Sequence, residues 1–164
     1  TRRAREQRVT DDRPILVFAY GNPSRGDDAL GPTMYELLEE QQRQAGLLSD
    51  VALLTDFQLQ IEHATDLQQR QRIVFIDASL TASPPYELDP VQPEQDISYT
   101  THAMSPAAVL SVYQQIHRQP PPTTYMLSIR GYTFELGEPL CARARSHLQA
   151  AFEFLMKGPL LKLE

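Results

Sequence analysis

Three aspartates stand where apolar segments of the sequence end, and carboxylates in such places can bind a cation or accept a proton. Asp28 lies in the loop after the first apolar run, while Asp56 and Asp77 directly close the next two. If these runs are parallel strands, their carboxyl ends meet at one edge of a sheet, which is where α/β proteins bind ligands. Each aspartate alone also fits a turn or a helix N-cap. Together they predict a shared site.

His102 adds an imidazole to this set. It lies in YTTHAMSPAAVL, just ahead of Ser105 and Pro106, which are typical of a helix N-cap and first helical residue. Alone, such a histidine is more often a surface or capping residue. With two aspartates it forms a set of ligands that suits nickel, zinc or iron. Ligation of this kind is more open than a thiolate cage, which favours a transient or shared metal.

Other chemistries find little support in the sequence. There is no G-x-S-x-G elbow and no H-E-x-x-H helix. Cys141 falls in the body of a predicted helix, a poor place for a reactive thiolate, and is interpreted as a buried inert thiol. The loop GNPSRGDDALG lacks the dinucleotide-binding spacing, and Asp27 and Asp28 would repel a pyrophosphate. We therefore exclude a nucleotide site and a covalent nucleophile.

Strands and helices alternate along the predicted chain. Apolar runs predict strands at residues 14–20, 51–55, 72–77 and 124–129. Amphipathic spacing predicts helices at residues 33–44, 58–69, 105–117 and 139–156. Prolines make residues 80–100 irregular, with one edge strand. This order predicts an α/β sandwich with a mainly parallel sheet.

Length and composition set the broad class of the protein. A chain of 164 residues with 41% hydrophobic and 22% charged residues fits one globular domain, which we place at residues 14–164. Residues 1–13 predict a disordered leader that lacks the apolar region of a secretory signal. The net charge of −6 argues against a nucleic-acid partner, and no apolar run is long enough for a membrane span. A single cysteine fits a reducing compartment, so we expect the cytoplasm.

Three segments resemble the maturation proteases of nickel–iron hydrogenases. GNPSRGDDALGP, after the first predicted strand, resembles the G-N-x-x-x-x-D-(D/E)-x-x-G signature of that family. RIVFIDAS is similar to the family's third strand, and THAMSPAAVL is similar to the histidine-led segment that opens a later helix. The likeness extends from about residue 15 to 156. The first motif is fairly specific, whereas the other two are informative only in combination with it.

The resemblance implies a fold, an activity and a partner. The fold is a three-layer, phosphorylase/hydrolase-like sandwich with a twisted five-stranded sheet flanked by helices. The activity is that of an aspartic-type endopeptidase, which removes the C-terminal extension of the hydrogenase large-subunit precursor once nickel has been inserted. The nickel is expected to come with the substrate, and no permanent metal is assured.

The resemblance also assigns roles to residues of this sequence. Asp28, Asp77 and His102 stand at the positions of the family's metal contacts, and Asp28 replaces the glutamate of many members. Asp56 matches a further aspartate, which we expect to orient the attacking water. The candidate catalytic residues are therefore Asp28, Asp56, Asp77 and His102. The candidate substrate contacts are Asn22, Asp27 and Glu62.

The segment after the second predicted strand departs from the family. Many members have a glycine-rich stretch after the aspartate, whereas this chain has DFQLQIEHATDL. Glu62 and His63 in this segment are interpreted either as substrate contacts or as one face of a helix with ion pairs to Arg70 or Arg72. The sequence alone leaves both interpretations open.

Two other functions compete with the protease. A non-enzymatic nickel carrier or chaperone could use the same carboxylates and histidine. A strand that runs into Gly-Asn-Pro also opens the peptidyl-tRNA hydrolases, but their histidine segment is missing here and the acidic charge does not suit a tRNA ligand. We expect a monomer, because the sequence does not indicate a large exposed apolar face.

Overall fold

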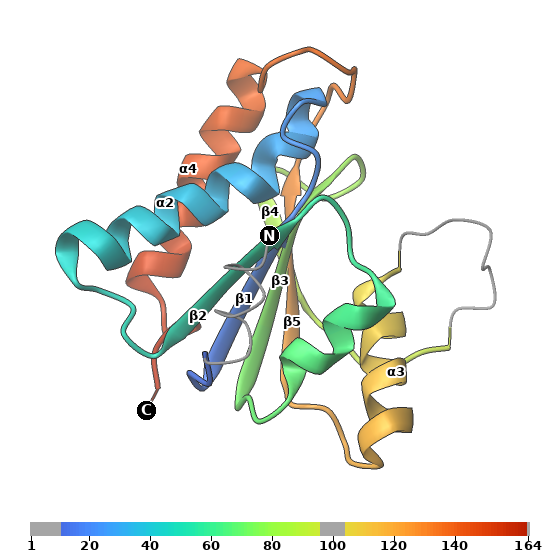
Figure 1. The fold of residues 1–164 in the computed structure, drawn as a ribbon. Helices are drawn as coiled ribbons and strands as arrows, with labels where there is room; N and C mark the ends of the chain where they lie inside the picture. Colours follow the sequence, from blue (N-terminus) through green and yellow to red (C-terminus); the bar gives the residue numbers. More distant parts are fainter. Residues whose placement is uncertain (1–10, 96–103, 164) are drawn as a thin grey trace.

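A five-stranded sheet lies between two layers of helices in the structure, a computed structural model that describes residues 11–95 and 104–163 (Figure 1). The strands are β1 (Ile15–Tyr20), β2 (Val51–Asp56), β3 (Arg72–Ser79), β4 (Tyr86–Pro90) and β5 (Thr123–Arg130). Their spatial order is β2-β1-β3-β5-β4, and only β4 runs antiparallel to its neighbour. The predicted α/β sandwich with a twisted, mainly parallel five-stranded sheet is confirmed.

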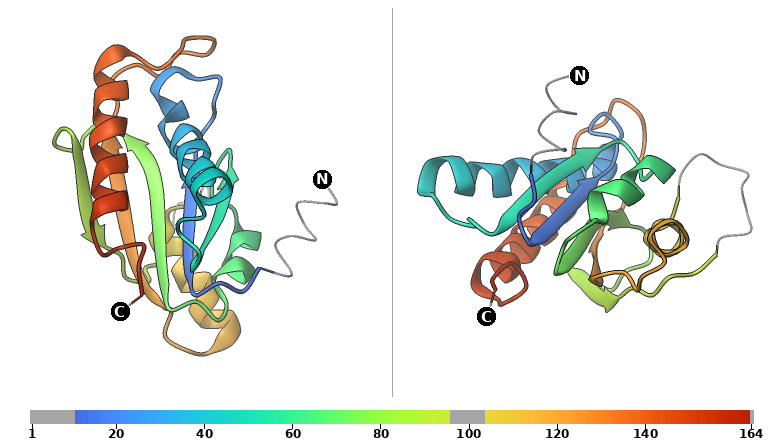
Figure 2. Two further views of the ribbon diagram at one scale, coloured as in Figure 1. Left: turned by 90° about the vertical axis from the view of Figure 1, so that its left-hand side faces the viewer. Right: turned by 60° about the horizontal axis from the view of Figure 1, so that its bottom comes forward.

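Helical segments cover both faces of this sheet. They are η1 (Gly26–Ala29), α2 (Leu30–Ala45), η2 (Ile61–Leu67), α3 (Pro106–His117) and α4 (Ala142–Lys157), of which η1 and η2 are 3₁₀ helices. Figure 2 shows α2 and α4 together on one side of the sheet and α3 on the other. The short helix η2 packs with α3 on that second side.

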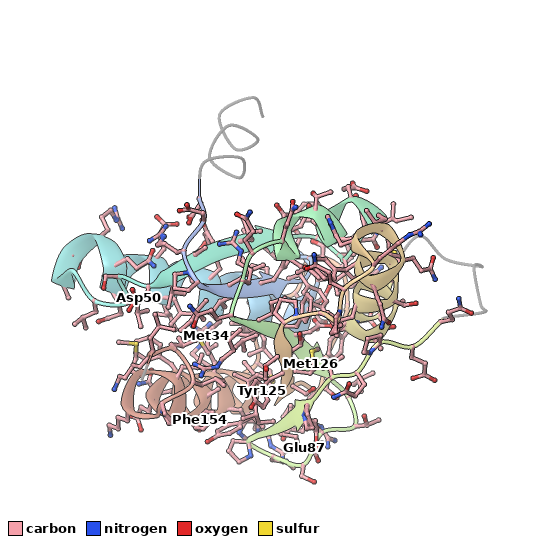
Figure 3. All side chains as sticks on the ribbon, turned by 90° about the horizontal axis from the view of Figure 1, so that it is seen from below. Met34, Asp50, Glu87, Tyr125, Met126 and Phe154 are labelled. Atoms are coloured by element: carbon pink, nitrogen blue, oxygen red, sulfur yellow. The ribbon has the colours of Figure 1, made fainter. Side chains whose placement is uncertain are left out.

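Strand β1 is buried along its whole length because both faces of the sheet are covered. Its alternate residues serve two cores: Val17 packs in the cluster formed with α2 and α4, and Phe18 in the cluster formed with η2 and α3. Adjacent residues of β5 divide in the same way. Tyr125 packs with the α2 and α4 cluster, while Met126 packs with the α3 cluster (Figure 3).

Local signals placed some helix ends better than others. Helix α3 begins as predicted: Ser105 is its N-cap, and the Ala108 N–H donates to Ser105 Oγ at 3.1 Å. Helix α2 begins three residues before the predicted 33, because η1 leads directly into it. The predicted helix at 58–69 is the shorter 3₁₀ helix η2.

The last helix begins later than predicted. Cys141 is the N-cap of α4 rather than a residue of the helix body, so that prediction is wrong. Its backbone is extended, and its sulfur accepts a hydrogen bond from the Ala144 N–H at 3.4 Å. The Cys141 N–H and S–H both donate to the carboxylate of Asp27, which lies in η1, 114 residues earlier. This distant partner, which local sequence does not reveal, determines where the helix starts.

Arg70 fixes the described end of the predicted leader. Its guanidinium donates to the carbonyl oxygens of Asp11 and Arg13, and Arg13 pairs with the Asp11 carboxylate at 2.7 Å. Residues 1–10 lie outside the described part of the chain, so the prediction of a disordered leader stays a prediction. Across the described residues, no helix combines the length and apolar character that a membrane span requires.

Candidate functional site

The candidate site lies at the carboxyl edge of the sheet, where the chain reverses its direction of winding. From β1 the chain moves outward to β2 and then returns across β1 to β3. Crossovers of this kind leave a crevice beyond the carboxyl ends of the two central strands, which is the usual ligand site of open α/β sheets. Here that position lies between the ends of β1 and β3.

Asp28 is held beside this position by the loop that follows β1. The Asn22 N–H donates to Asp28 Oδ2 at 2.8 Å. The loop folds back so closely that a side chain at Gly21, whose φ is +149°, would lie 2.1 Å from the carbonyl oxygen of Asp28. Glycine is required at this position because only it combines that backbone angle with so close an approach. The GN pair of the first motif therefore positions the carboxylate.

Asp77 lies on β3 and follows Ile73 and Phe75 on the α3 face of the sheet. Its Oδ1 accepts a hydrogen bond from the Ala78 N–H at 2.8 Å. Burial, followed by the negative charge of Asp28, raises the pKa of Asp77 to about 7, against the smaller opposing effect of the Ala78 bond. The two predicted metal contacts therefore lie close enough to repel each other, and Asp77 retains a proton over much of the acidic range.

Tyr20, the last residue of β1, belongs to the same cluster. Burial raises the pKa of its hydroxyl well above the usual value, and the charges of Asp77 and Asp28 raise it further. The neutral phenol therefore lies within the field of both carboxylates. The sequence left its role open, although the alternation of β1 already placed it on the same face as Phe18.

Asp56 lies on the other side of β1, at the end of β2 and opposite Tyr20 in the strand register. Its Oδ1 accepts from the Phe57 N–H at 2.8 Å, and its Oδ2 lies 3.1 Å from His63 Nε2. The Asp56 side chain is 36% exposed, so it is accessible at the sheet edge. The structure thus places all three predicted aspartates at one edge of the sheet.

The fourth candidate, His102, lies outside the described residues. The first residue described after that gap is Met104, whose N–H donates to the Leu59 carbonyl at 3.1 Å. This bond ties the approach to α3 to the segment that follows β2. Within residues 11–95 and 104–163, no three His, Cys, Asp or Glu side chains are arranged to hold a metal. The metal role of Asp28, Asp77 and His102 stays a prediction.

Asp27 has a structural role instead of the predicted role in substrate contact. Its side chain is fully buried, and its carboxylate accepts from the N–H groups of Tyr132, Thr133 and Cys141 and from the Cys141 thiol. Burial alone would raise its pKa, but these bonds outweigh that effect and hold the pKa below its usual value. Both oxygens of Asp27 are buried and take part in these bonds inside the fold, which corrects the prediction of a substrate contact.

The remaining substrate candidates are exposed or half-buried. Asn22 is half-buried, and its side-chain oxygen accepts from the Ser24 N–H at 2.9 Å. Glu62 is exposed on η2. Arg70 donates to the backbone carbonyls of Asp11 and Arg13, and Arg72 donates to those of Leu160 and Lys162, so both of the arginines proposed as ion-pair partners of Glu62 bond to the main chain. Both interpretations of Glu62 stay predictions.

His63 differs from both interpretations of it. It is fully buried, so it is neither a surface contact for substrate nor part of an exposed helix face. Its ring lies edge-on to Phe18, with 4.6 Å between the ring centroids, and it is bonded to Asp56. The only sequence signal for this contact is the spacing of seven residues between Asp56 and His63. That spacing brings the two side chains together only because η2 folds back under the edge of the sheet.

Comparison with known proteins gives a fold. No protein-family model matches the sequence, and no curated protein matches it. Among solved structures, the NiFe hydrogenase maturation protease HycI from Thermococcus kodakarensis KOD1 matches with a TM-score of 0.64 and 19% identity, over 93% of this chain and 96% of that chain. The hydrogenase maturating endopeptidase HybD from E. coli matches with a TM-score of 0.64 and 20% identity, over 86% and 88%. The NiFe hydrogenase maturation protease HybD from Thermococcus kodakarensis matches with a TM-score of 0.64 and 21% identity, over 87% of this chain and 97% of that chain. This chain therefore has the α/β fold of the NiFe hydrogenase maturation proteases.

Proposed function

We propose that this chain is an endopeptidase of hydrogenase maturation. It removes the C-terminal extension of a nickel–iron hydrogenase large-subunit precursor after nickel insertion, and it recognises the nickel that the precursor carries. The proposal includes a cytoplasmic location and a monomeric enzyme. Its supports are the fold shared with such proteases, the motif that positions Asp28, and the carboxylates at the sheet edge.

The observation that carries the proposal is the close pair of Asp28 and Asp77. Their repulsion and the burial of Asp77 leave one site with a proton near neutral pH. A divalent cation relieves this repulsion, because it brings positive charge that both carboxylates attract and displaces the proton of Asp77. Carboxylate oxygens with one imidazole, which His102 would supply, suit nickel. A pair arranged in this way favours a metal that arrives with the substrate.

Contact with the substrate's nickel places the scissile peptide beside Asp56. The nickel can polarise the carbonyl or activate a bound water, and Asp56 orients the water and takes its proton. The water oxygen bonds to the carbonyl carbon, the C–N bond breaks, and the proton passes to the departing amine. The phenol of Tyr20 stays neutral beside the pair and contributes no charge of its own.

Exposed apolar side chains surround this edge of the sheet, which fits a protein substrate. Four residues that are more than half exposed lie in the segments that follow the carboxyl ends of β2, β3 and β5: Phe57, Ile61, Leu80 and Leu136. The loop that holds Leu136 is joined to the loop after β1 by a bridge to Arg25. Apolar residues gathered at a functional edge mark a binding surface for another protein.

Replacing Phe57 or Leu80 by Ser should raise the KM for the precursor about 5-fold and leave kcat within about 2-fold, as expected for the loss of one apolar contact worth about 1 kcal/mol. Ile116→Ser is the matched control, because Ile116 is equally exposed but lies in α3, ahead of the amino end of β5. Steady-state cleavage of nickel-loaded precursor measures both constants. Equal KM values for all three variants would remove the apolar residues from the binding surface.

The central experiment compares cleavage of nickel-loaded and nickel-free precursor, with mass analysis of the products. We expect loss of a C-terminal peptide only from the loaded form, and loss of that activity in Asp28→Asn and His102→Ala. Asp89→Asn is the control, because Asp89 is exposed on the edge strand β4. No cleavage of either form, together with tight binding of free nickel by this chain, would favour the carrier.

A further inference from the structure

We infer that His63 is a positioning residue for Asp56, to which its neutral imidazole donates a hydrogen bond that fixes the carboxylate in one orientation. The inference rests on the proposed function, in which Asp56 orients the attacking water. It concerns the segment in which this chain departs from the glycine-rich stretch of the proteases that it resembles. The supporting observations are the tautomer of His63, its burial and the bonds to both oxygens of Asp56.

The surroundings of His63 decide its tautomer. The backbone N–H of Gln60 donates to His63 Nδ1 at 2.8 Å, so that nitrogen must present a lone pair. In a neutral ring the proton then lies on Nε2, which is 3.1 Å from Asp56 Oδ2. Protonation of Nδ1 would bring two donors face to face. The contact with Asp56 is therefore a hydrogen bond from Nε2–H to a carboxylate.

Burial prevents the ring from leaving this position. The His63 side chain is 1% exposed, and the ring of Phe18 packs against it in a T-shaped arrangement. The Gln60 side chain accepts in turn from the His63 N–H, so the two residues bond reciprocally at the start of η2. Leu59 and Ala64, on either side of His63 in sequence, are fully buried in the second core. Packing in the core therefore holds the His63 ring in place.

The result is a carboxylate restrained at both oxygens. Asp56 Oδ1 accepts from the Phe57 N–H, and Oδ2 accepts from His63. A carboxylate at the end of a strand otherwise rotates about its side-chain bonds. Second partners of this kind typically change activity by about 10-fold to 100-fold when removed, because they orient the group that acts.

The test uses two variants of His63 and one matched control. His63→Phe keeps a buried ring but removes both hydrogen bonds. His63→Gln keeps an acceptor for Gln60 and a donor for Asp56 on one planar group. His147→Phe is the control, since it also breaks an imidazole hydrogen bond, with Tyr132 Oη at 2.8 Å, on helix α4.

We expect His63→Phe to lower kcat about 10-fold to 100-fold with KM within about 2-fold, and His63→Gln to restore most of kcat. The control should leave both constants unchanged. Thermal unfolding of each variant identifies any that fails to fold, and if His63→Phe does not fold, the NMR measurement of the His63 tautomer decides the inference. A wild-type kcat in folded His63→Phe, or equal losses in the Phe and Gln variants, would overturn the inference.

A second measurement does not depend on cleavage. Nitrogen-15 NMR of the wild-type protein should show His63 as the Nε2–H tautomer at pH 7, and replacement of Asp56 by Ala should shift the Nε2 proton resonance. The Nδ1–H tautomer, or an unchanged resonance, would overturn the inference whether or not the wild type cleaves. Failure of the wild type to cleave, with the expected NMR result, would reject the proposed function and leave the His63–Asp56 pairing intact.

Discussion

Replacing Asp27 by Asn should lower the free energy of unfolding at pH 7 by about 3 kcal/mol. The Asp27 carboxylate is fully buried and accepts from three backbone N–H groups and the Cys141 thiol. An amide has only one acceptor oxygen, and its NH₂ group would face N–H donors. The variant should also lose part of its cleavage activity, because Asp27 ties η1, which also carries Asp28, to the start of α4.

Urea unfolding of wild type and Asp27→Asn measures this effect, with Asp89→Asn as the control for loss of an exposed charge. The pKa of Asp27 is lowered in the folded protein, so its stabilising effect is present above its unfolded pKa and is lost as pH falls through the folded value. The difference in free energy of unfolding between wild type and Asp27→Asn should therefore become smaller in strong acid. Equal unfolding midpoints for the two at pH 7 would contradict a structural role for Asp27.

Replacing Asp77 by Asn should have opposite effects on stability and activity. Burial and the charge of Asp28 raise the pKa of Asp77 from 3.8 to about 7. Between these values the folded protein keeps a proton that the unfolded chain releases, so wild-type stability falls as pH rises through this window. At about 1.4 kcal/mol per pKa unit, the shift bounds the cost above pH 7 at roughly 4 kcal/mol. A neutral amide does not incur this cost.

At pH 8 we expect Asp77→Asn to be more stable than wild type by about 2 kcal/mol, which is about half of that bound. At pH 4 the two proteins should have similar stability. Cleavage of nickel-loaded precursor should fall at least about 100-fold, because an amide binds a divalent cation weakly and cannot carry its charge. Urea unfolding of the metal-free proteins across this pH range checks the first expectation. A variant whose stability follows the wild-type pH dependence would contradict the raised pKa.

Asp28→Asn separates the two causes of that pKa shift. It removes the negative charge beside Asp77 but leaves Asp77 buried, so the pH dependence of stability should become shallower without disappearing. If the dependence were unchanged, the two carboxylates would not interact, and the observation that carries the proposed function would be lost.

The sequence alone predicted those features that depend on a few neighbouring residues. Apolar runs marked the buried strands, since a strand covered on both faces needs no polar alternation. The Ser105-Pro106 pair marked the start of α3, because a cap is made within one turn of helix. Aspartates at three strand ends indicated a shared site, since parallel strands end at one edge. The order of elements then gave the α/β architecture.

Only the tertiary structure separated residues that the sequence presents as equivalent. Asp27 and Asp28 are adjacent, yet one is buried under the start of α4 and the other lies beside Asp77. Cys141 starts a helix instead of lying within it, and His63 serves Asp56 from inside the core. The partners of Asp27 and Cys141 lie more than 100 residues away in sequence, and Asp77 lies far from Asp28 along the chain as well. The His63 contact closes only when η2 packs under the sheet, and no local pattern of residues contains that information.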